Sequence, residues 1–339
     1  MAVRVGLMGL GRIGRNLFRI LYDRDDVVLA VASEVADPKS LEYLLRFDTI
    51  LGRFPGDLRL RDGEFHVRGR RIPLHIERVP GQVPWDLHGV DIVVEATARP
   101  RARVELERHL ALGVQGVILC APPREPPDAT VVIGVNDDRL RAADRIVSNG
   151  SCTAHCAAPV IRILHDAFGI ERAFLNTVHA YTNQQRLADV PAEDLRSGRA
   201  AAENIIPQTT NAAQVIEGLI PELAGRITAM AMNVPVSNGS VVDLVCWHAR
   251  PVTRDAICEV MRAAAAAERW RNVLDYEDDP IVSADIAHSP YSGTFDAEAT
   301  MVLGDRVSKT LTWYDNGWGY AHRVVDLVQR MAALRREPS

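Results

Sequence analysis

Cys152 stands in a stretch whose residue types suit nucleophilic chemistry. The stretch reads Ser-Asn-Gly-Ser-Cys-Thr-Ala-His-Cys over residues 148–156, between a strand-like run at 144–147 and a helical pattern at 158–168. Backbone N–H groups converge where a strand gives way to a helix, and the positive end of the helix dipole favours a thiolate there. The same pattern fits a buried structural cysteine, so the stretch alone leaves both interpretations open.

Two neighbours of Cys152 suggest further chemistry. Cys156 follows about one helical turn later, so we expect it to pack inward rather than react. Cys152 and Cys156, with His155 between them, could also suggest a metal site. The sequence has no second ligand cluster with zinc spacing, so we expect no metal. His179 ends a strand-like run at 172–178. A histidine there is usually a packed core residue, yet it is the best available base for Cys152.

A glycine loop near the start of the chain predicts a dinucleotide site. Gly9, Gly11 and Gly14 follow an apolar strand at 3–8 and precede an amphipathic helix pattern that reaches residue 22. Gly9 would allow a tight turn, Gly11 the close approach of a pyrophosphate, and Gly14 the packing of helix on strand. Glu34 follows the next strand, at 27–32, where a carboxylate accepts ribose hydroxyls and repels a 2′-phosphate. The pattern therefore favours NAD over NADP.

The rest of the chain supplies the elements that must position these residues. Strand and helix patterns alternate through the first half, which predicts an α/β domain with a doubly wound parallel sheet. The strand at 90–96 ends at Thr97, where open sheets of this kind bind ligands. Runs of strands with separate helices in the second half predict an α+β domain. A long polar segment at 184–201 is expected to be a functional or interface loop.

Composition narrows the class of protein. The 339 residues are 47% hydrophobic and 24% charged, which is ordinary for a globular protein long enough for two cores. A net charge of −5 gives no general attraction to nucleic acid or to an anionic membrane, and no apolar run reaches transmembrane length. Five scattered cysteines argue against a disulfide framework. We therefore expect a cytoplasmic protein that binds neither nucleic acid nor membrane.

The motifs together resemble the glyceraldehyde-3-phosphate dehydrogenase family from end to end, and the related erythrose-4-phosphate dehydrogenases share the pattern. The resemblance rests on the glycine loop, on Ser-Asn-Gly-Ser-Cys-Thr at 148–153, on His-Ala-Tyr-Thr-Asn at 179–183, on Arg-Ala-Ala-Ala at 199–202, on Asn-Ile-Ile-Pro at 204–207, and on Trp-Tyr-Asp-Asn-Gly-Trp-Gly-Tyr at 313–320. It implies a Rossmann NAD-binding domain at 1–150, completed by a C-terminal helix at 317–339, and a catalytic domain with a mixed sheet at 151–316. It also implies a homotetramer in which the 184–201 loop packs near a neighbour's cofactor site.

The resemblance also assigns roles to single residues. Cys152 corresponds to the nucleophile and His179 to the base, in an NAD-dependent oxidation of an aldehyde through a thioester. Inorganic phosphate, or water, then releases the acyl group. Pro191 matches a position that favours NAD. The implied cofactor-binding residues are Gly9, Gly11, Arg12, Ile13, Gly14, Glu34, Arg78, Thr97, Asn316 and Tyr320. The implied substrate- and phosphate-binding positions are Ser151, Thr153, Thr182, Gln184, Arg199, Thr210, Asn211 and Asn233.

Departures from the family gather where the substrate's own phosphate binds. Gln184 stands in place of an Asp, Asn233 in place of an Arg, and Asn211 in place of a Gly. An Asn offers phosphate only neutral donors, whereas Arg offers a permanent charge in a bidentate fork. One alternative is therefore a divergent homologue acting on a different or non-phosphorylated aldehyde; an inhibitor-resistant isozyme is another. A non-catalytic NAD-binding interaction protein is a further alternative, against which the presence of both Cys152 and His179 counts.

Overall fold

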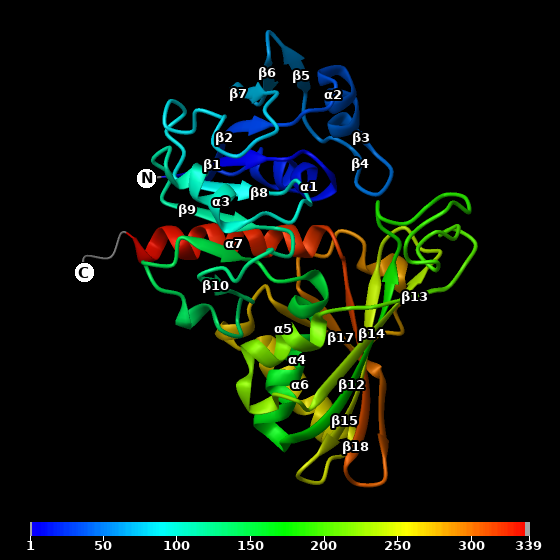
Figure 1. Ribbon diagram of the computed structural model, residues 1–339. Helices are drawn as coiled ribbons and strands as arrows, with labels where there is room; N and C mark the ends of the chain where they lie inside the picture. The colour runs from blue at the N-terminus through cyan, green and yellow to red at the C-terminus, as the bar shows by residue number, and fades with distance from the viewer. Residues whose placement is uncertain (1, 336–339) are drawn as a thin grey trace. The chain divides into compact units, whose positions relative to one another are not determined.

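The computed structural model describes residues 2–335, so residues 336–339 of the helix expected at 317–339 lie outside the described part. The chain forms two compact units (Figure 1). Unit 1 contains the residues up to Ser151 and those from Ala321 onward, and unit 2 is Cys152–Tyr320. No helix among the described residues is long and apolar enough to cross a membrane.

Unit 1 is built on a nine-stranded sheet in the order β10-β11-β9-β8-β1-β2-β7-β6-β5. The strands from β10 to β7 in this order are parallel, and the β5–β6–β7 edge is an antiparallel meander. The strands are β1 Val3–Met8, β2 Val27–Ser33, β5 Leu58–Arg61, β6 Glu64–Val67, β7 Arg70–His75, β8 Ile92–Glu95, β9 Gly116–Leu119, β10 Ala129–Thr130 and β11 Ile146–Ser148, with a separate pair β3 Phe47–Asp48 and β4 Gly52–Arg53. Its helices are α1 Arg12–Leu21, α2 Pro38–Arg46 and α3 Arg103–Leu110.

The strand order fixes where unit 1 can bind a ligand. The chain runs outward from β1 through β2 in one direction, then returns to β8 on the other side of β1 and continues through β9 and β11. The order therefore reverses between β1 and β8, and ligands bind such sheets at the carboxyl ends of the strands beside that point. The central strands β8 and β9 are buried along their whole length, as expected for a sheet covered on both faces. The predicted doubly wound parallel sheet is confirmed.

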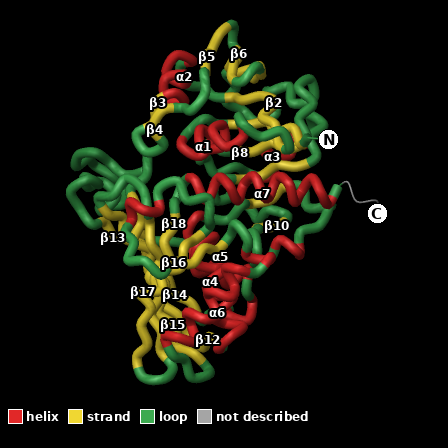
Figure 2. The backbone as a smooth tube through the Cα atoms, turned by 180° about the vertical axis from the view of Figure 1, so that it is seen from behind, coloured by secondary structure: helices red, strands yellow, loops and turns green. Residues whose placement is uncertain are grey.

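Unit 2 is built on a seven-stranded mixed sheet in the order β13-β14-β12-β15-β18-β17-β16. The pairs β12–β14 and β16–β17 are parallel, and the others are antiparallel. Helices α4, α5 and α6 lie on one face of this sheet (Figure 2). The elements are α4 Cys152–Phe168, β12 Ile170–Ala180, β13 Ile206–Gln208, α5 Ala212–Leu219, β14 Ile227–Val234, β15 Ser240–His248, α6 Arg254–Ala266, β16 Leu274–Glu277, β17 Gly293–Leu303 and β18 Val307–Tyr314. The predicted α+β domain with a mixed sheet is confirmed.

Short 3-10 helices and one long helix complete the chain. The 3-10 helices are Asp137–Arg139, Pro221–Leu223, Glu268–Trp270 and Ser283–Ile286. Helix α7, Trp318–Leu334, begins in unit 2 and continues into unit 1, where the methyl group of Met331 lies against Gly116 of β9. Residues 181–205 contain no helix or strand, as expected for the 184–201 loop; an isolated bridge joins Arg186 to Ala200.

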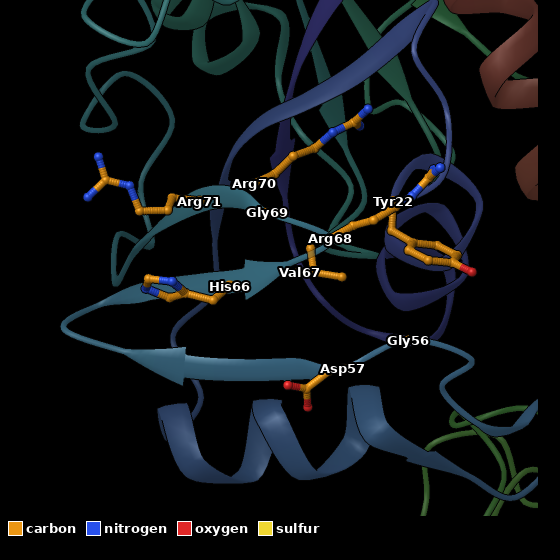
Figure 3. Close-up of a pocket in the computed structure, with 9 residues that line it drawn as sticks. All are labelled: Tyr22, Gly56, Asp57, His66, Val67, Arg68, Gly69, Arg70 and Arg71. Atoms are coloured by element: carbon orange, nitrogen blue, oxygen red, sulfur yellow. The ribbon is translucent and has the colours of Figure 1, made fainter.

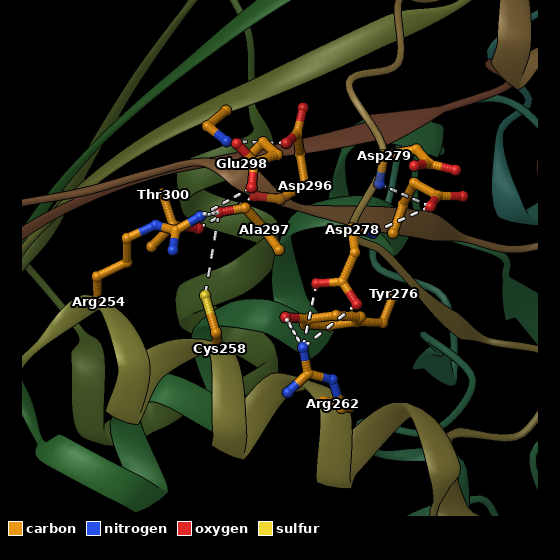
Figure 4. A network of polar contacts seen from close by, with 12 residues as sticks. Arg254, Cys258, Arg262, Tyr276, Asp278, Asp279, Asp296, Ala297, Glu298 and Thr300 are labelled. Atoms are coloured by element: carbon orange, nitrogen blue, oxygen red, sulfur yellow. Dashed lines mark hydrogen bonds and ion pairs between the residues drawn. The ribbon is translucent and has the colours of Figure 1, made fainter.

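A polar network fastens α6 to the edge strands of unit 2 (Figure 4). Arg254 donates to the carbonyl oxygen of Ala297 at 2.9 Å, and the Cys258 thiol faces the same oxygen at 4.0 Å. Arg262 donates to the Tyr276 hydroxyl at 3.0 Å. Burial, together with the Cys258 thiol, raises the pKa of Tyr276 to about 12, so its hydroxyl stays protonated. These contacts hold α6 against β16 and β17, and they involve none of the candidate site residues.

The helix that follows the Cys152 stretch begins earlier than the sequence predicted. The pattern indicated a helix from residue 158, whereas α4 begins at Cys152 itself and contains Pro159. A proline inside a helix removes one backbone hydrogen bond and normally ends or kinks the helix. Here the residues from Thr153 to Ile161 are all buried, and tertiary packing of this kind overrides local propensity. The cysteine thus occupies the first turn of the helix.

Candidate functional site

Cys152 and His179 face each other in unit 2. Cys152 is the first residue of α4, and His179 lies near the carboxyl end of β12. The Cys152 Sγ is 3.6 Å from His179 Nε2, which is within reach of a thiol–imidazole hydrogen bond. His179 Nδ1 lies 2.6 Å from the carbonyl oxygen of Ala180, which can only accept. The Nδ1 atom therefore carries the ring's proton, and Nε2 is left to exchange a proton with the sulfur.

The surroundings of Cys152 favour its thiolate. Burial raises the pKa of the thiol, but the hydrogen bond and charge of His179 and the backbone N–H of Thr153 outweigh burial, so the pKa lies below its ordinary value. Cys156 is the opposite case, because burial and the nearby Cys152 raise its pKa well above the ordinary value. The pKa of Cys152 is thus lowered and that of Cys156 raised. Cys156 packs inward, as the sequence predicted, and its Sγ lies 3.5 Å from the carbonyl oxygen of Thr312.

Tyr314 completes this cluster, although sequence reasoning assigned it no role. It ends β18, is 1% exposed, and places its ring edge-on to His179 with the centroids 5.9 Å apart. Its hydroxyl lies 3.0 Å from Thr153 Oγ1 and 2.8 Å from Thr177 Oγ1, so it links α4 to β12. Burial raises the pKa of Tyr314 well above its ordinary value, which keeps the hydroxyl neutral. The only sequence signal was its place in the Trp-Tyr-Asp-Asn motif.

The glycine loop of unit 1 has the geometry that a dinucleotide requires. Gly9 has φ +101°, and a Cβ there would lie 2.7 Å from the backbone nitrogen of Thr97. A Cβ on Gly14 would strike the carbonyl oxygen of Gly9, whereas one on Gly11 would meet no atom within 4 Å. The loop is therefore tight at Gly9, closely packed at Gly14 and open at Gly11, where α1 begins without a side-chain cap. Amides left open at a helix N-terminus suit a pyrophosphate.

Glu34 lies against this loop. Its Oε2 accepts a hydrogen bond from the backbone nitrogen of Leu10 at 2.8 Å, and its Oε1 accepts one from Val35 at 2.7 Å. The carboxylate is thus brought to the open side of the glycine turn, where ribose hydroxyls are expected. Arg12, Ile13 and Thr97 are half-buried, and Arg78 is exposed just beyond β7.

The remaining cofactor candidates are buried residues of unit 2. Asn316 is 7% exposed, and its side-chain oxygen accepts no hydrogen bond from residues 2–335. Its neighbour Asp315 accepts hydrogen bonds from the backbone nitrogens of Gly317 and Trp318, which holds the start of α7 in place. A buried amide oxygen without a donor is suited to receive the carboxamide N–H of a nicotinamide. Tyr320 is 6% exposed, with its ring 5.9 Å from that of His155.

The candidate phosphate residues are only partly brought together. Asn233 is 8% exposed and lies directly beside His179, its Cα partner in the parallel β12–β14 pair. Thr182 follows β12 and donates to Gln185 at 2.8 Å, whereas the Gln184 side chain is exposed. Arg199 pairs with Asp189 at 2.9 Å within the 181–205 loop.

Three further phosphate candidates flank helices. Thr210 accepts a hydrogen bond from the backbone nitrogen of Ala212 at 3.2 Å, beside the exposed Asn211 that precedes α5. Ser151 is half-buried and immediately precedes α4.

A separate hollow of about 560 Å³ lies in unit 1 between Tyr22, the Gly56–Asp57 segment and the β6–β7 hairpin (Figure 3). Arg68 and Arg70 line it, but they pair with Asp23 and Asp25, so their charges are balanced. None of the candidate site residues lines this hollow. Within residues 2–335, no group of three or more His, Cys, Asp or Glu side chains is arranged to hold a metal ion.

Comparisons with known proteins show to which family the chain belongs. Residues 3–102 match the family described as glyceraldehyde 3-phosphate dehydrogenase, NAD binding domain, and residues 151–316 match its C-terminal domain. A glyceraldehyde-3-phosphate dehydrogenase of Geobacillus stearothermophilus is 43% identical over 334 residues, 98% of this chain and 99% of that protein. One from Streptomyces coelicolor is 43% identical over 96% of this chain and 98% of its own length. Glyceraldehyde-3-phosphate dehydrogenase 2 of Bacillus subtilis is 43% identical over 100% of this chain and 99% of its own length. The cofactor is NAD, and the chain belongs to the glyceraldehyde-3-phosphate dehydrogenase family.

Proposed function

We propose that this chain oxidises glyceraldehyde 3-phosphate through a thioester on Cys152 and passes the acyl group to inorganic phosphate. The observation that carries the proposal is the 3.6 Å approach of Cys152 Sγ to His179 Nε2, together with the lowered pKa of the thiol. A low-pKa thiol with a base in reach is the arrangement that covalent catalysis at an aldehyde needs. Membership of the family supports the substrate class.

The chemistry follows from these two residues. The Cys152 thiolate, whose proton is held by His179 as the imidazolium, adds to the aldehyde carbon, and the imidazolium returns that proton to the new alkoxide to give a hemithioacetal. His179 Nε2 takes the proton of its hydroxyl, and a thioester remains after two electrons and one hydrogen leave the carbon. NAD, when bound, supplies the acceptor for that hydride. Attack of hydrogen phosphate on the thioester carbonyl then releases an acyl phosphate and the thiolate, the proton of the hydrogen phosphate leaves to solvent, and the starting thiolate–imidazolium pair is restored.

We also propose that the cofactor and the catalytic groups are held by two different parts of the chain. Residues 1–150, completed by the helix at 317–339, hold NAD, and residues 151–316 hold the catalytic groups. The open amides at Gly11 and the carboxylate of Glu34 support the first assignment, since each fits a different part of the dinucleotide. Asn316 belongs to the second range, and its unsatisfied amide oxygen is assigned to the nicotinamide carboxamide. The other cofactor contacts are assigned to Gly9, Arg12, Ile13, Gly14, Arg78, Thr97 and Tyr320.

Phosphate is assigned to two neighbouring groups of residues. Ser151, Thr153, Arg199, Thr210 and Asn211 take the attacking inorganic phosphate. Thr182, Gln184 and Asn233 face the substrate's own phosphate. The position of Asn233 beside His179 supports the second group, because a substrate held there keeps its aldehyde close to the base. That group carries no formal charge, and the comparisons do not favour the divergent alternative that its residues suggested.

A single assay tests the proposal. The purified chain is given NAD and glyceraldehyde 3-phosphate, with and without inorganic phosphate, and formation of the reduced cofactor is followed. We expect sustained turnover only with phosphate present. Cys152→Ser is the matched variant, and it should bind NAD but give no turnover. Sustained turnover by Cys152→Ser, or none by the wild type, would refute the proposed function.

We also propose a cytoplasmic homotetramer. Phe174 of β12, Met230 of β14 and Trp247 of β15 are 57%, 41% and 36% exposed on the sheet of unit 2. The rings of Phe174 and Trp247 lie 5.8 Å apart, which makes a connected apolar surface of the kind that subunit interfaces cover. The five free cysteines support a reducing compartment. Light scattering of the wild type should give the mass of four chains, and Phe174→Glu should lower it.

A further inference from the structure

Glu95 is a charged residue sealed inside unit 1, at the end of β8. Its side chain is 1% exposed, and burial of an unpaired carboxylate is strongly unfavourable. The Oε1 atom accepts two hydrogen bonds from the same residue, one from the backbone nitrogen of Thr97 at 3.1 Å and one from the Thr97 hydroxyl. The carboxylate therefore folds back on the strand end and fixes the backbone N–H and the hydroxyl of Thr97.

The second oxygen of Glu95 faces two further buried residues. Arg101 Nε lies 3.4 Å from Oε2, and His109 Nε2 lies 3.8 Å from it. Trp85 donates its indole N–H to His109 Nδ1 at 2.9 Å. Since Nδ1 is the acceptor, the proton of a neutral His109 ring is on Nε2 and points toward Glu95. Burial alone raises the pKa of Glu95, but His109, Thr97 and Arg101 outweigh it and hold the pKa below its ordinary value.

The strand end that Glu95 fixes is also the surface against which the glycine loop packs. A Cβ on Gly9 would lie 2.7 Å from Thr97 N and 2.7 Å from the carbonyl carbon of Ala96. Ala98 follows with φ +58°, a left-handed conformation that is unfavourable for alanine, so the segment needs support to keep its path. Because Gly9 packs against the backbone of Thr97, any movement of Thr97 would change the position of the glycine turn.

We infer that Glu95 is a positioning residue for NAD: it locks Thr97 against the glycine loop, and Arg101, His109 and Trp85 lock Glu95 in turn. The inference rests on the proposed function, in which Thr97 and the loop bind NAD. Glu95 acts through Thr97 and does not itself touch the cofactor. This role differs from that of an ordinary core residue, whose removal would lower stability without a specific change in the affinity for NAD.

The experiment compares three variants by the dissociation constant of NAD and by kcat at saturating NAD. Glu95→Gln keeps the size of the side chain but loses its charge toward Arg101 and His109. Trp85→Phe removes the donor that sets the His109 tautomer, and it also leaves a smaller ring in the core of unit 1. Arg19→Gln is the matched control, since Arg19 is 6% exposed and donates to the carbonyl oxygens of Leu45, Leu51 and Gly52, a different buried network of unit 1.

We expect Glu95→Gln to weaken NAD binding by roughly five- to thirtyfold, the effect of losing a charge-assisted contact, with kcat changed by less than about twofold. Trp85→Phe should weaken NAD binding by a smaller factor. Arg19→Gln should lower the melting temperature without changing the affinity for NAD. If Glu95→Gln folds and binds NAD as tightly as the wild type, the inference is wrong. If it does not fold, an unchanged affinity in Trp85→Phe overturns the inference instead. A wild type that binds no NAD would contradict the proposed function itself, which is a separate result.

Discussion

Cys152 and His179 face each other because Cys152 is the first residue of α4 and His179 lies near the carboxyl end of β12. The sulfur lies 3.6 Å from Nε2, while the other ring nitrogen is held by the carbonyl oxygen of Ala180. The hydrogen bond from Nδ1 to the backbone orients the His179 ring, so that Nε2 faces the Cys152 sulfur. The pairing supports the proposal that Cys152, of the five free cysteines, is the nucleophile.

The pH dependence of alkylation tests this pairing. The pKa of Cys152 is lowered, so its thiolate persists below the ordinary thiol pKa and disappears only as the pH falls through the lowered value. We expect the rate of alkylation by iodoacetamide to follow that fraction. In His179→Asn the effect of burial dominates and the thiol pKa rises. The alkylation rate at neutral pH should then fall by roughly tenfold each time the pKa increases by about one. Cys156→Ser should leave the profile unchanged, because the Cys156 pKa is raised. Identical profiles for wild type and His179→Asn would contradict the pairing.

The Tyr314 hydroxyl is expected to stabilise unit 2. Tyr314→Phe leaves the buried hydroxyls of Thr153 and Thr177 without this partner, which should lower the free energy of unfolding by about 1–3 kcal/mol. Urea titration of the Cys152→Ser background measures this without thiol chemistry. Tyr276→Phe is the control, since Tyr276 is half-buried and its hydroxyl meets the exposed Arg262 side chain, and the loss should stay below about 1 kcal/mol. Equal losses in the two variants would mean that the buried position of Tyr314 adds nothing.

Ala98 offers a test of stored backbone strain. Its φ of +58° lies in the left-handed region, where a Cβ costs about 1–2 kcal/mol. Ala98→Gly should therefore raise the free energy of unfolding by about 1 kcal/mol, after the extra chain entropy of glycine is subtracted. Ala111→Gly, at a residue with φ −65°, should lower it. A destabilised Ala98→Gly would show that the Cβ makes contacts worth more than the strain.

We expect Asn233 to influence how the chain treats a phosphorylated aldehyde. It lies beside His179 with a neutral side chain, so we expect Asn233→Arg to raise kcat/KM for glyceraldehyde 3-phosphate by about tenfold or more. Unphosphorylated glyceraldehyde should gain nothing, and Asn233→Met should help neither substrate. An equal effect of Asn233→Arg on both aldehydes would show that the residue does not face the substrate's phosphate.

The sequence predicted those parts of the fold that depend on local patterns. The turn at Gly9, the open position at Gly11 and the close packing at Gly14 follow from residue type and spacing, and the structure has each of them. The beginning of α4 was predicted six residues too late. Pro159 and the polar residues of the first turn are unfavourable for a helix by local propensity, whereas α4 is stabilised mainly by burial.

The contacts of the site depend on register over long separations. Cys152 and His179 are 27 residues apart, and Thr153 and Tyr314 are 161 apart. The spacing of apolar residues along the chain does not show which side chains of distant strands come together. The contacts of Tyr314 with Thr153 and Thr177 were therefore not predicted. The departure at Asn233 was visible in the sequence, but its place beside His179 became visible only in the paired strands.

In the proposed reaction, Cys152 carries the acyl group during oxidation. The direct measurement mixes the enzyme with NAD and glyceraldehyde 3-phosphate in the absence of inorganic phosphate, quenches with acid, and maps the added mass by peptide mass spectrometry. We predict one acyl group on the peptide that contains Cys152, formed together with one equivalent of reduced cofactor, and none in Cys152→Ser. Reduced cofactor formed with an unmodified Cys152, or an acyl group on Cys156 or another residue, would contradict the claim.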